Sequence, residues 1–154
     1  MRLFCILLLT LITLLSTTFA QTASKRRLVA NLKNNTVADG CGCYFQFWGS
    51  KRDSERYMFV SPIDDDKAAW MNIAGRDVRL SLVKEKGLRI KEQLGSRHAE
   101  KYSAGNITVN ATYITTRICD PNDENCESSD YSATFVVRKA QKTQTVKAFG
   151  TCGC

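Results

Sequence analysis

The sequence predicts an all-β fold: a small antiparallel barrel or sandwich of seven to eight strands, stabilised by disulfide bonds. Apolar and polar residues alternate through several short segments, which is the pattern of strands with one buried face. Turn-forming residues separate these segments. Six cysteines follow an N-terminal export signal. These three observations favour a single disulfide-stabilised β domain.

The clearest alternation lies in residues 130–138, where apolar side chains occupy every second position. Residues 106–119 and 76–84 alternate in the same way. The full set of expected strands is 43–49, 55–61, 67–74, 76–84, 106–119, 130–138 and 143–150, with 88–90 as the candidate eighth.

The connections are predicted from residues that favour turns. Ala74-Gly75 indicates a tight hairpin between the strands 67–74 and 76–84. Pro62 is expected to end the strand 55–61. Residues 119–130 are hydrophilic and separate the two longest strands. Residues 85–105 show the weakest strand pattern, so we expect a long connection there.

Residues 1–20 have the features of a secretory signal peptide, with Arg2 ahead of an apolar run and small residues up to Ala20. The apolar run is shorter than the roughly 20 residues that a spanning helix needs. We therefore expect cleavage near Ala20, no transmembrane segment in the mature chain, and a periplasmic or secreted protein. Residues 21–40 are expected to form a basic, partly disordered segment, and residues 41–154 a single β domain.

The charge pattern bears on partners. The chain has a formal net charge of +7, which falls to +6 when the signal peptide takes Arg2 with it. Basic residues gather in 21–40 rather than among aromatic residues, which argues against nucleic-acid binding. The expected partners are another exported protein or an anionic envelope polymer.

The aromatic residues near the first strands are interpreted as core and barrel-rim positions. They are Tyr44, Phe45, Phe47, Trp48 and Trp70.

The cysteines are predicted to form disulfides, because their number is even and the chain carries an export signal. Cys119 and Cys126 bracket a hydrophilic loop and form the expected first pair, although acidic residues in that loop leave calcium binding as an alternative. The other four stand in two Cys-Gly-Cys triplets, 41–43 and 152–154. A closed barrel pairs its first and last strands, which would bring the triplets together.

Antiparallel pairing would join Cys41 to Cys154 and Cys43 to Cys152. The alternatives are one bond with two free thiols, a zinc or copper site formed by all four sulfurs, or a thiol-redox pair. Disulfides are favoured, so no cofactor is expected.

No catalytic residue is predicted. His98 is the only histidine, and we expect it to be a solvated loop residue. Asp64, Asp65 and Asp66 are expected to solvate a turn. Glycan acceptor triplets begin at Asn34, Asn106 and Asn110, and their use depends on the host.

The hairpin and strand of residues 68–82, "AAWMNIAGRDVRLSL", together with the plan of signal, short tail and β body, resemble small exported bacterial β-barrel proteins of the C-type lysozyme inhibitor kind. Those inhibitors carry a Ser-Gly pair ahead of a Tyr in their inhibitory loop. Here Gly95 and Ser96 stand in reversed order and Tyr102 is displaced. The resemblance therefore implies the architecture rather than the inhibitory site.

The function expected from the sequence is that of an exported non-enzymatic β domain, a binding or envelope-associated protein with an unspecified ligand. The alternatives are a metal-binding or thiol-redox protein that uses Cys41, Cys43, Cys152 and Cys154, and a lysozyme-inhibitor-like protein.

Overall fold

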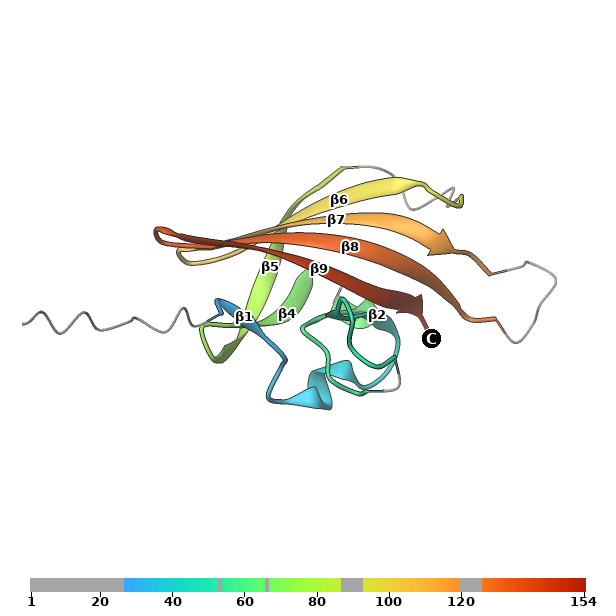
Figure 1. Ribbon diagram of the computed structural model, residues 1–154, viewed down its shortest axis with the longest axis horizontal. Coiled ribbons are helices and arrows are strands. Elements are labelled where there is room, and N and C mark those ends of the chain that lie inside the picture. The colour runs from blue at the N-terminus through green and yellow to red at the C-terminus, as the bar shows by residue number, and fades with distance from the viewer. Residues whose placement is uncertain (1–26, 53, 66, 87–92, 120–125) are drawn as a thin grey trace, which may run out of the picture.

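The computed structural model describes residues 27–52, 54–65, 67–86, 93–119 and 126–154, and it is a closed antiparallel barrel of eight strands with one extra strand (Figure 1). This confirms the all-β prediction and selects the barrel over the sandwich. The strands are β1 (Val29–Ala30), β2 (Gly42–Phe47), β3 (Phe59–Pro62), β4 (Ala68–Ile73), β5 (Arg76–Lys86), β6 (Arg97–Ala104), β7 (Ile107–Arg117), β8 (Ser128–Lys139) and β9 (Lys142–Gly153). Two short 3₁₀ helices, η1 (Asn35–Ala38) and η2 (Ile63–Asp65), lie between them.

The barrel is an up-and-down meander. Each strand from β2 to β8 pairs antiparallel with the next strand in sequence, and β9 pairs with β2 to close the ring. Closure leaves no unpaired edge in the ring itself. The short strand β1 pairs with the end of β4, beyond the stretch of β4 that pairs with β3.

The two sides of the barrel differ in strand length. We call β5–β9 the long wall, whose strands have 8 to 12 residues, and β2–β4 the short wall, whose strands have 4 to 6. Strands β6 to β9 run side by side along the molecule, while β2 and η1 lie on the opposite side (Figure 1).

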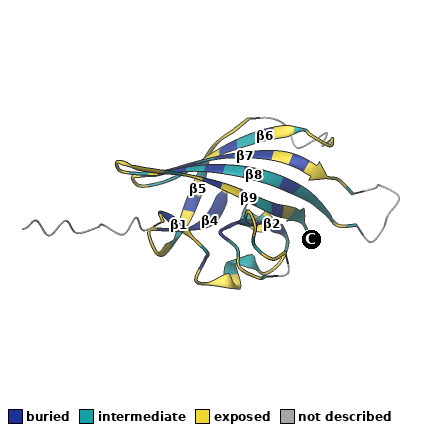
Figure 2. Cartoon of the chain, viewed as in Figure 1, coloured by how far each residue is buried: buried dark blue, intermediate teal, exposed yellow. Residues whose placement is uncertain are grey.

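Aromatic side chains fill the barrel interior. Phe45, Phe59 and Phe135 are fully buried, with the Phe59 and Phe135 ring centres 4.8 Å apart. Tyr102 and Tyr113 extend this cluster from β6 and β7. Figure 2 shows buried residues alternating mostly with residues of intermediate burial along β7 and β8. An eight-stranded barrel has room inside for side chains or one small ligand, and here side chains occupy most of the interior.

The eighth strand is not where the sequence placed it. Strand β6 lies within residues 85–105, which were expected to form a connection, whereas the candidate strand 88–90 falls outside the described residues. The inward positions of β6 include His98 and Glu100, which are 6% and 5% exposed. Polar residues at core positions removed the apolar alternation on which strand prediction depends.

The β domain begins upstream of residue 41. Leu28, Val29 and Leu32 are buried, and the backbone N–H groups of Leu28 and Val29 donate to Gln144 Oε1 over 2.6 and 3.2 Å. These residues fall in the segment 21–40, which was expected to be partly disordered. Strand β1 was not predicted because a two-residue strand is too short to show an alternating pattern. The expected signal peptide lies outside the described residues. No helix in the described part of the chain is long and apolar enough to cross a bilayer.

Two disulfides staple the closing pair of strands. Cys43 lies opposite Cys152 in the β2–β9 ladder, and the pairs Cys41–Cys154 and Cys43–Cys152 are bonded as antiparallel pairing predicts. We call this region, Cys41–Cys43 with Cys152–Cys154, the seam.

The glycines of the seam are sterically required. A side chain on Gly42 would place its Cβ 2.7 Å from the Ser61 carbonyl oxygen, and one on Gly153 would meet Ser128 Cα at 2.6 Å. The neighbouring backbones therefore leave no room for Cβ atoms between the paired cysteines.

The third disulfide, Cys119–Cys126, joins the ends of the connection between β7 and β8, as predicted. The acidic residues considered for calcium lie mostly in 120–125, outside the described residues. Three disulfides in one small domain indicate an oxidising compartment of the extracellular type.

Candidate ligand-binding site

A pocket of about 480 Å³ lies on the outer face of the barrel, beneath the connection between β2 and β3. We call it the outer pocket. Its walls combine aromatic rings with hydroxyl, amide and charged groups, which is the usual composition of a small-ligand site. The lining residues are Tyr44, Gln46, Trp48, Gly49, Ser50, Arg52, Tyr57, Thr116, Asp130, Tyr131, Ser132, Phe149, Gly150 and Thr151.

The strand register builds the pocket floor in two rows. Tyr44 lies opposite Thr151, which lies opposite Asp130, so one row crosses β2, β9 and β8. The second row runs parallel to it and consists of Gln46, Phe149 and Ser132. All six belong to the strand positions that alternate with core residues, so they face outward.

The roof of the pocket is the β2–β3 loop, residues 48–58, which hydrogen bonds hold in place. The N–H of Ser50 donates to the Phe47 carbonyl over 3.0 Å, and that of Ser54 to the Lys51 carbonyl over 3.1 Å. Gln46 Nε2 reaches up from the floor and donates to the Ser54 carbonyl. The side chain of Gln46 therefore ties the roof directly to strand β2.

The aromatic residues of β2 divide between the two faces of the barrel. Phe45 belongs to the core, as the sequence suggested, whereas Tyr44 and Trp48 line the outer pocket. Trp48 is 65% exposed and meets the Phe149 ring edge to face at 6.4 Å. The Tyr44 and Tyr57 rings are 5.3 Å apart. Trp48 directly follows the last residue of β2 and is mostly exposed, so of the two expected positions, core and barrel rim, it does not occupy the core.

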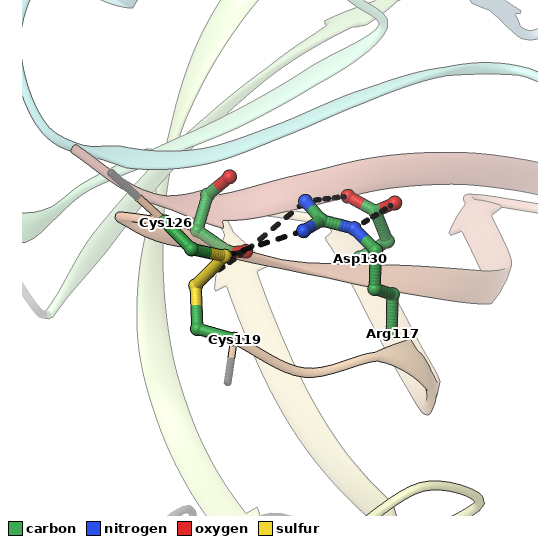
Figure 3. A network of polar contacts seen from close by, with 5 residues as sticks. Arg117, Cys119, Cys126 and Asp130 are labelled. Carbon is green, nitrogen blue, oxygen red and sulfur yellow. Dashed lines mark hydrogen bonds and ion pairs between the residues drawn. A yellow bond between two sulfur atoms is a disulfide. The ribbon is translucent and has the colours of Figure 1, made fainter. Parts of the chain in front are cut away.

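Asp130 and Arg117 form an ion pair at one end of the pocket (Figure 3). The Arg117 Nε to Asp130 Oδ2 distance is 2.9 Å, and Nη2 to Oδ1 is 3.2 Å. A β-bulge at Thr116 places Arg117, rather than Thr116, opposite Asp130. Arg117 also donates to Cys126 Sγ and the Ser128 carbonyl, so it links the pocket to the third disulfide.

The charges of the pocket are not balanced. Hydrogen bonding to Asp130, followed by electrostatic attraction to it, raises the pKa of Arg117 above its ordinary value, and this pair neutralises itself. Asp130 and Arg52 are the charged residues that line the pocket, and because Arg117 from outside the lining pairs with Asp130, the guanidinium of Arg52 is left without a carboxylate partner among the described residues.

Tyr44 is held in its neutral form. Its hydroxyl donates to the Gly40 carbonyl. Burial, followed by the nearby Tyr57, Asp39 and Asp64, raises the pKa of Tyr44 above its ordinary value of 10.0.

Gln46 carries an unmatched acceptor. The residue is 4% exposed, and its Oε1 atom is buried with no hydrogen-bond partner in the described structure. A buried polar atom without a partner typically costs about 1–3 kcal/mol. Buried polar atoms are normally paired with a protein group or an ordered water, so this one calls for a partner.

The remaining residues singled out in the sequence lie elsewhere. His98 is buried in β6 with its ring stacked on Tyr113 at 4.5 Å, so its interpretation as a solvated loop residue was wrong. Asp65 lies in η2 and pairs with Arg79, as a solvated turn residue can. The seam cysteines and Cys119–Cys126 are bonded in pairs, and the described residues contain no cluster of side chains suited to a metal ion.

A second, smaller cavity of about 280 Å³ lies beside the seam at the end of the barrel. Its lining includes Cys43, Cys152, Ser61 and Glu100. Glu100 accepts a hydrogen bond from the Tyr102 hydroxyl over 2.6 Å. This cavity is polar and lacks the aromatic wall of the outer pocket.

The fold and site together define a disulfide-closed, up-and-down β barrel with an aromatic pocket on its outer face. No family model, curated protein or solved structure matches the chain.

Proposed function

We propose that this chain is a non-enzymatic exported binding protein that holds a small ligand in the outer pocket. The observation that carries the proposal is the pocket itself, a space of about 480 Å³ whose lining residues include the exposed Trp48, Arg52, and Gln46 with its buried, unmatched amide oxygen. A buried Trp48 would stabilise the fold, whereas an exposed one beside a cavity contributes mainly to recognition.

The chemistry of the lining favours binding over catalysis. Among the residues that line the outer pocket, Asp130 is the only carboxylate, and Arg117 occupies both of its oxygens. General acid–base catalysis needs a group that can give or take a proton at working pH. Asp130 in its ion pair is poorly suited to that role.

Chemical-shift mapping tests the proposal. The oxidised protein, labelled with ¹⁵N, would be titrated with a neutral trisaccharide, an acidic trisaccharide and octanoate. We expect at least one of them to shift the amide signals of Ser50, Ser132 and Thr151 and the indole signal of Trp48. The ligand signals should remain unchanged over a day, because no turnover is expected. Shifts confined to the cavity beside the seam, or no shifts with any probe, would contradict the proposal.

The barrel architecture also supports a second candidate, inhibition of C-type lysozyme. Its support is limited to the fold, since Gly95 and Ser96 lie in the turn before β6 and Tyr102 points into the core. A lysozyme assay at high molar excess tests it, and full residual lysozyme activity would dispose of it.

The metal or thiol-redox alternative concerns the reduced protein. In the structure the four seam sulfurs are joined in pairs and offer no thiolate to zinc or copper. Elemental analysis combined with thiol titration of the purified protein distinguishes a metal site formed by free thiols from the two seam disulfides. Stoichiometric metal with four titratable thiols would favour a metal site over the seam disulfides.

A further inference from the structure

The unmatched groups of the outer pocket specify a ligand class, an inference that rests on the proposed binding function. We infer that the pocket binds a carboxylated sugar ring, a hexuronate unit of an acidic glycan. The ring lies against Trp48, the carboxylate pairs with Arg52, and a ring hydroxyl donates to Gln46. The three contacts correspond to the exposed indole, the guanidinium without a carboxylate partner and the unmatched amide oxygen.

The exposed guanidinium of Arg52 is available to pair with an anion. Arg117 already neutralises Asp130, while Arg52 has no carboxylate partner among the described residues. A guanidinium presents parallel N–H donors that match the two oxygens of a carboxylate. The chain as a whole also carries a net positive charge of +7, which attracts acidic polymers in general.

The polar groups of the floor favour a sugar over an apolar acid. Gln46 offers a buried acceptor, and Ser132 and Thr151 present hydroxyls from the two floor rows. A fatty acid would cover these groups without pairing them, which costs affinity. A sugar ring supplies hydroxyls at its edge.

The aromatic wall suits the faces of the same ring. Sugar rings carry C–H groups on their faces, and these pack against aromatic surfaces. Trp48 keeps most of its surface exposed at the pocket, with Phe149 supporting it edge to face. A rigid indole offers a large contact area at little cost in conformational entropy.

Calorimetry with matched ligands tests the inference. The oxidised protein would be titrated with trigalacturonate, with the neutral galactose trisaccharide and with octanoate, at low salt. We expect trigalacturonate to bind at least tenfold more tightly than either comparison ligand, and its affinity to fall as salt is added.

Two neighbouring loop substitutions provide the matched control. Arg52→Gln removes the cation from the pocket lining, whereas Lys51→Gln removes a neighbouring cation that does not line the pocket. We expect Arg52→Gln to weaken trigalacturonate binding at least tenfold and to leave binding of the neutral trisaccharide unchanged. Lys51→Gln should change either affinity less than twofold.

The outcomes separate this inference from the proposed function. Equal affinity for the acidic and neutral sugars, or equal effects of the two loop substitutions, overturns the acidic ligand class and leaves a binding protein. Tighter binding of octanoate overturns the sugar class in the same way. Failure of all three ligands to bind overturns both.

Discussion

The long and short walls of the barrel both bury their inward side chains, but with strands of different length. In the long wall, tight turns join β6 to β7 and β8 to β9, where the ladder continues to Lys139 and Lys142. The connections 87–96 and 118–127 of the long wall are longer, and each lies partly outside the described residues. In the short wall, β2 and β3 are separated by residues 48–58, and residues of this loop line the outer pocket.

That difference locates the candidate site. The outer faces of β8 and β9 supply a regular floor, with side chains fixed by the ladder register. The β2–β3 loop supplies the roof and the cation at Arg52. The outer pocket therefore combines a floor of paired strands, to which β2 also contributes, with a roof formed by a loop, which is a common arrangement for binding sites. The walls meet at the β4–β5 pairing and at the β2–β9 pairing, and the disulfides of the seam cross-link the second of these.

Removing both seam disulfides is the substitution with the largest expected effect. The two bonds span 113 and 109 residues, but once one is present the other closes only a small additional loop. In the chain-entropy description, replacing one pair by serine costs about 2 kcal/mol and replacing both costs roughly 5 to 7 kcal/mol. Denaturant unfolding of the Cys41→Ser/Cys154→Ser, Cys43→Ser/Cys152→Ser and fourfold variants measures this. Additive losses would show that the bonds act independently.

Phe45 in β2 and Trp48, the residue that follows β2, should respond differently to truncation. Phe45 is fully buried against Phe59 and Phe135, so Phe45→Ala should cost about 3–5 kcal/mol of unfolding free energy. Trp48 is mostly exposed, so Trp48→Ala should cost less than about 1 kcal/mol while abolishing ligand shifts in the outer pocket. Urea unfolding and ligand titration of both variants check this. A large loss of unfolding free energy for Trp48→Ala would show that the Trp48 side chain contributes to core packing.

The short wall should weaken at alkaline pH through Tyr44. The folded state raises the Tyr44 pKa above 10.0, because burial disfavours the phenolate. Its contribution to stability is therefore complete below pH 10.0 and is lost as pH rises through the higher folded pKa. Tyr44→Phe should show a smaller drop in unfolding midpoint than the unmodified protein between about pH 9 and about pH 11. Identical drops would mean that Tyr44 does not contribute.

Turn substitutions should have the smallest effect, and a similar one in both walls. Ala74 and Ala140 adopt positive φ angles of 55° and 49° in tight turns, which asparagine tolerates better than alanine. Ala74→Asn and Ala140→Asn should each raise the unfolding free energy by about 0.5–1 kcal/mol. Thermal unfolding of the two variants measures it. A gain in one wall alone would show that the turns contribute to the difference between the walls.

Most of the fold could be predicted because inward apolar residues alternate cleanly. Tyr131, Ala133, Phe135 and Val137 are buried on one face of β8, as the pattern indicated. Strand β6 was missed for the opposite reason, since His98 and Glu100 occupy inward positions. The pairing of the seam cysteines followed from barrel closure, which brings the first and last strands of the ring together.

The candidate site was harder to predict because it depends on register and loop path. The sequence shows that Tyr44 and Trp48 share a face, but not which face is inward when both carry aromatic residues. The bulge that sets Arg117 against Asp130 leaves no local signal. The cation at Arg52 reaches the pocket only because the β2–β3 loop folds back over the barrel.

The separation of the seam cysteines along the chain also determines the order in which the disulfides can form during synthesis. Synthesis proceeds at about 5–20 residues per second, so Cys41 waits roughly ten seconds for Cys154, which is 113 residues away. Cys119 and Cys126 are seven residues apart and can meet within about a second. During that interval the thiols of Cys41 and Cys43 can form non-native disulfides with each other or with Cys119 and Cys126. The β2–β9 edge that closes the barrel is therefore cross-linked late, whereas the β4–β5 pairing connects the two walls without waiting for the C-terminal cysteines.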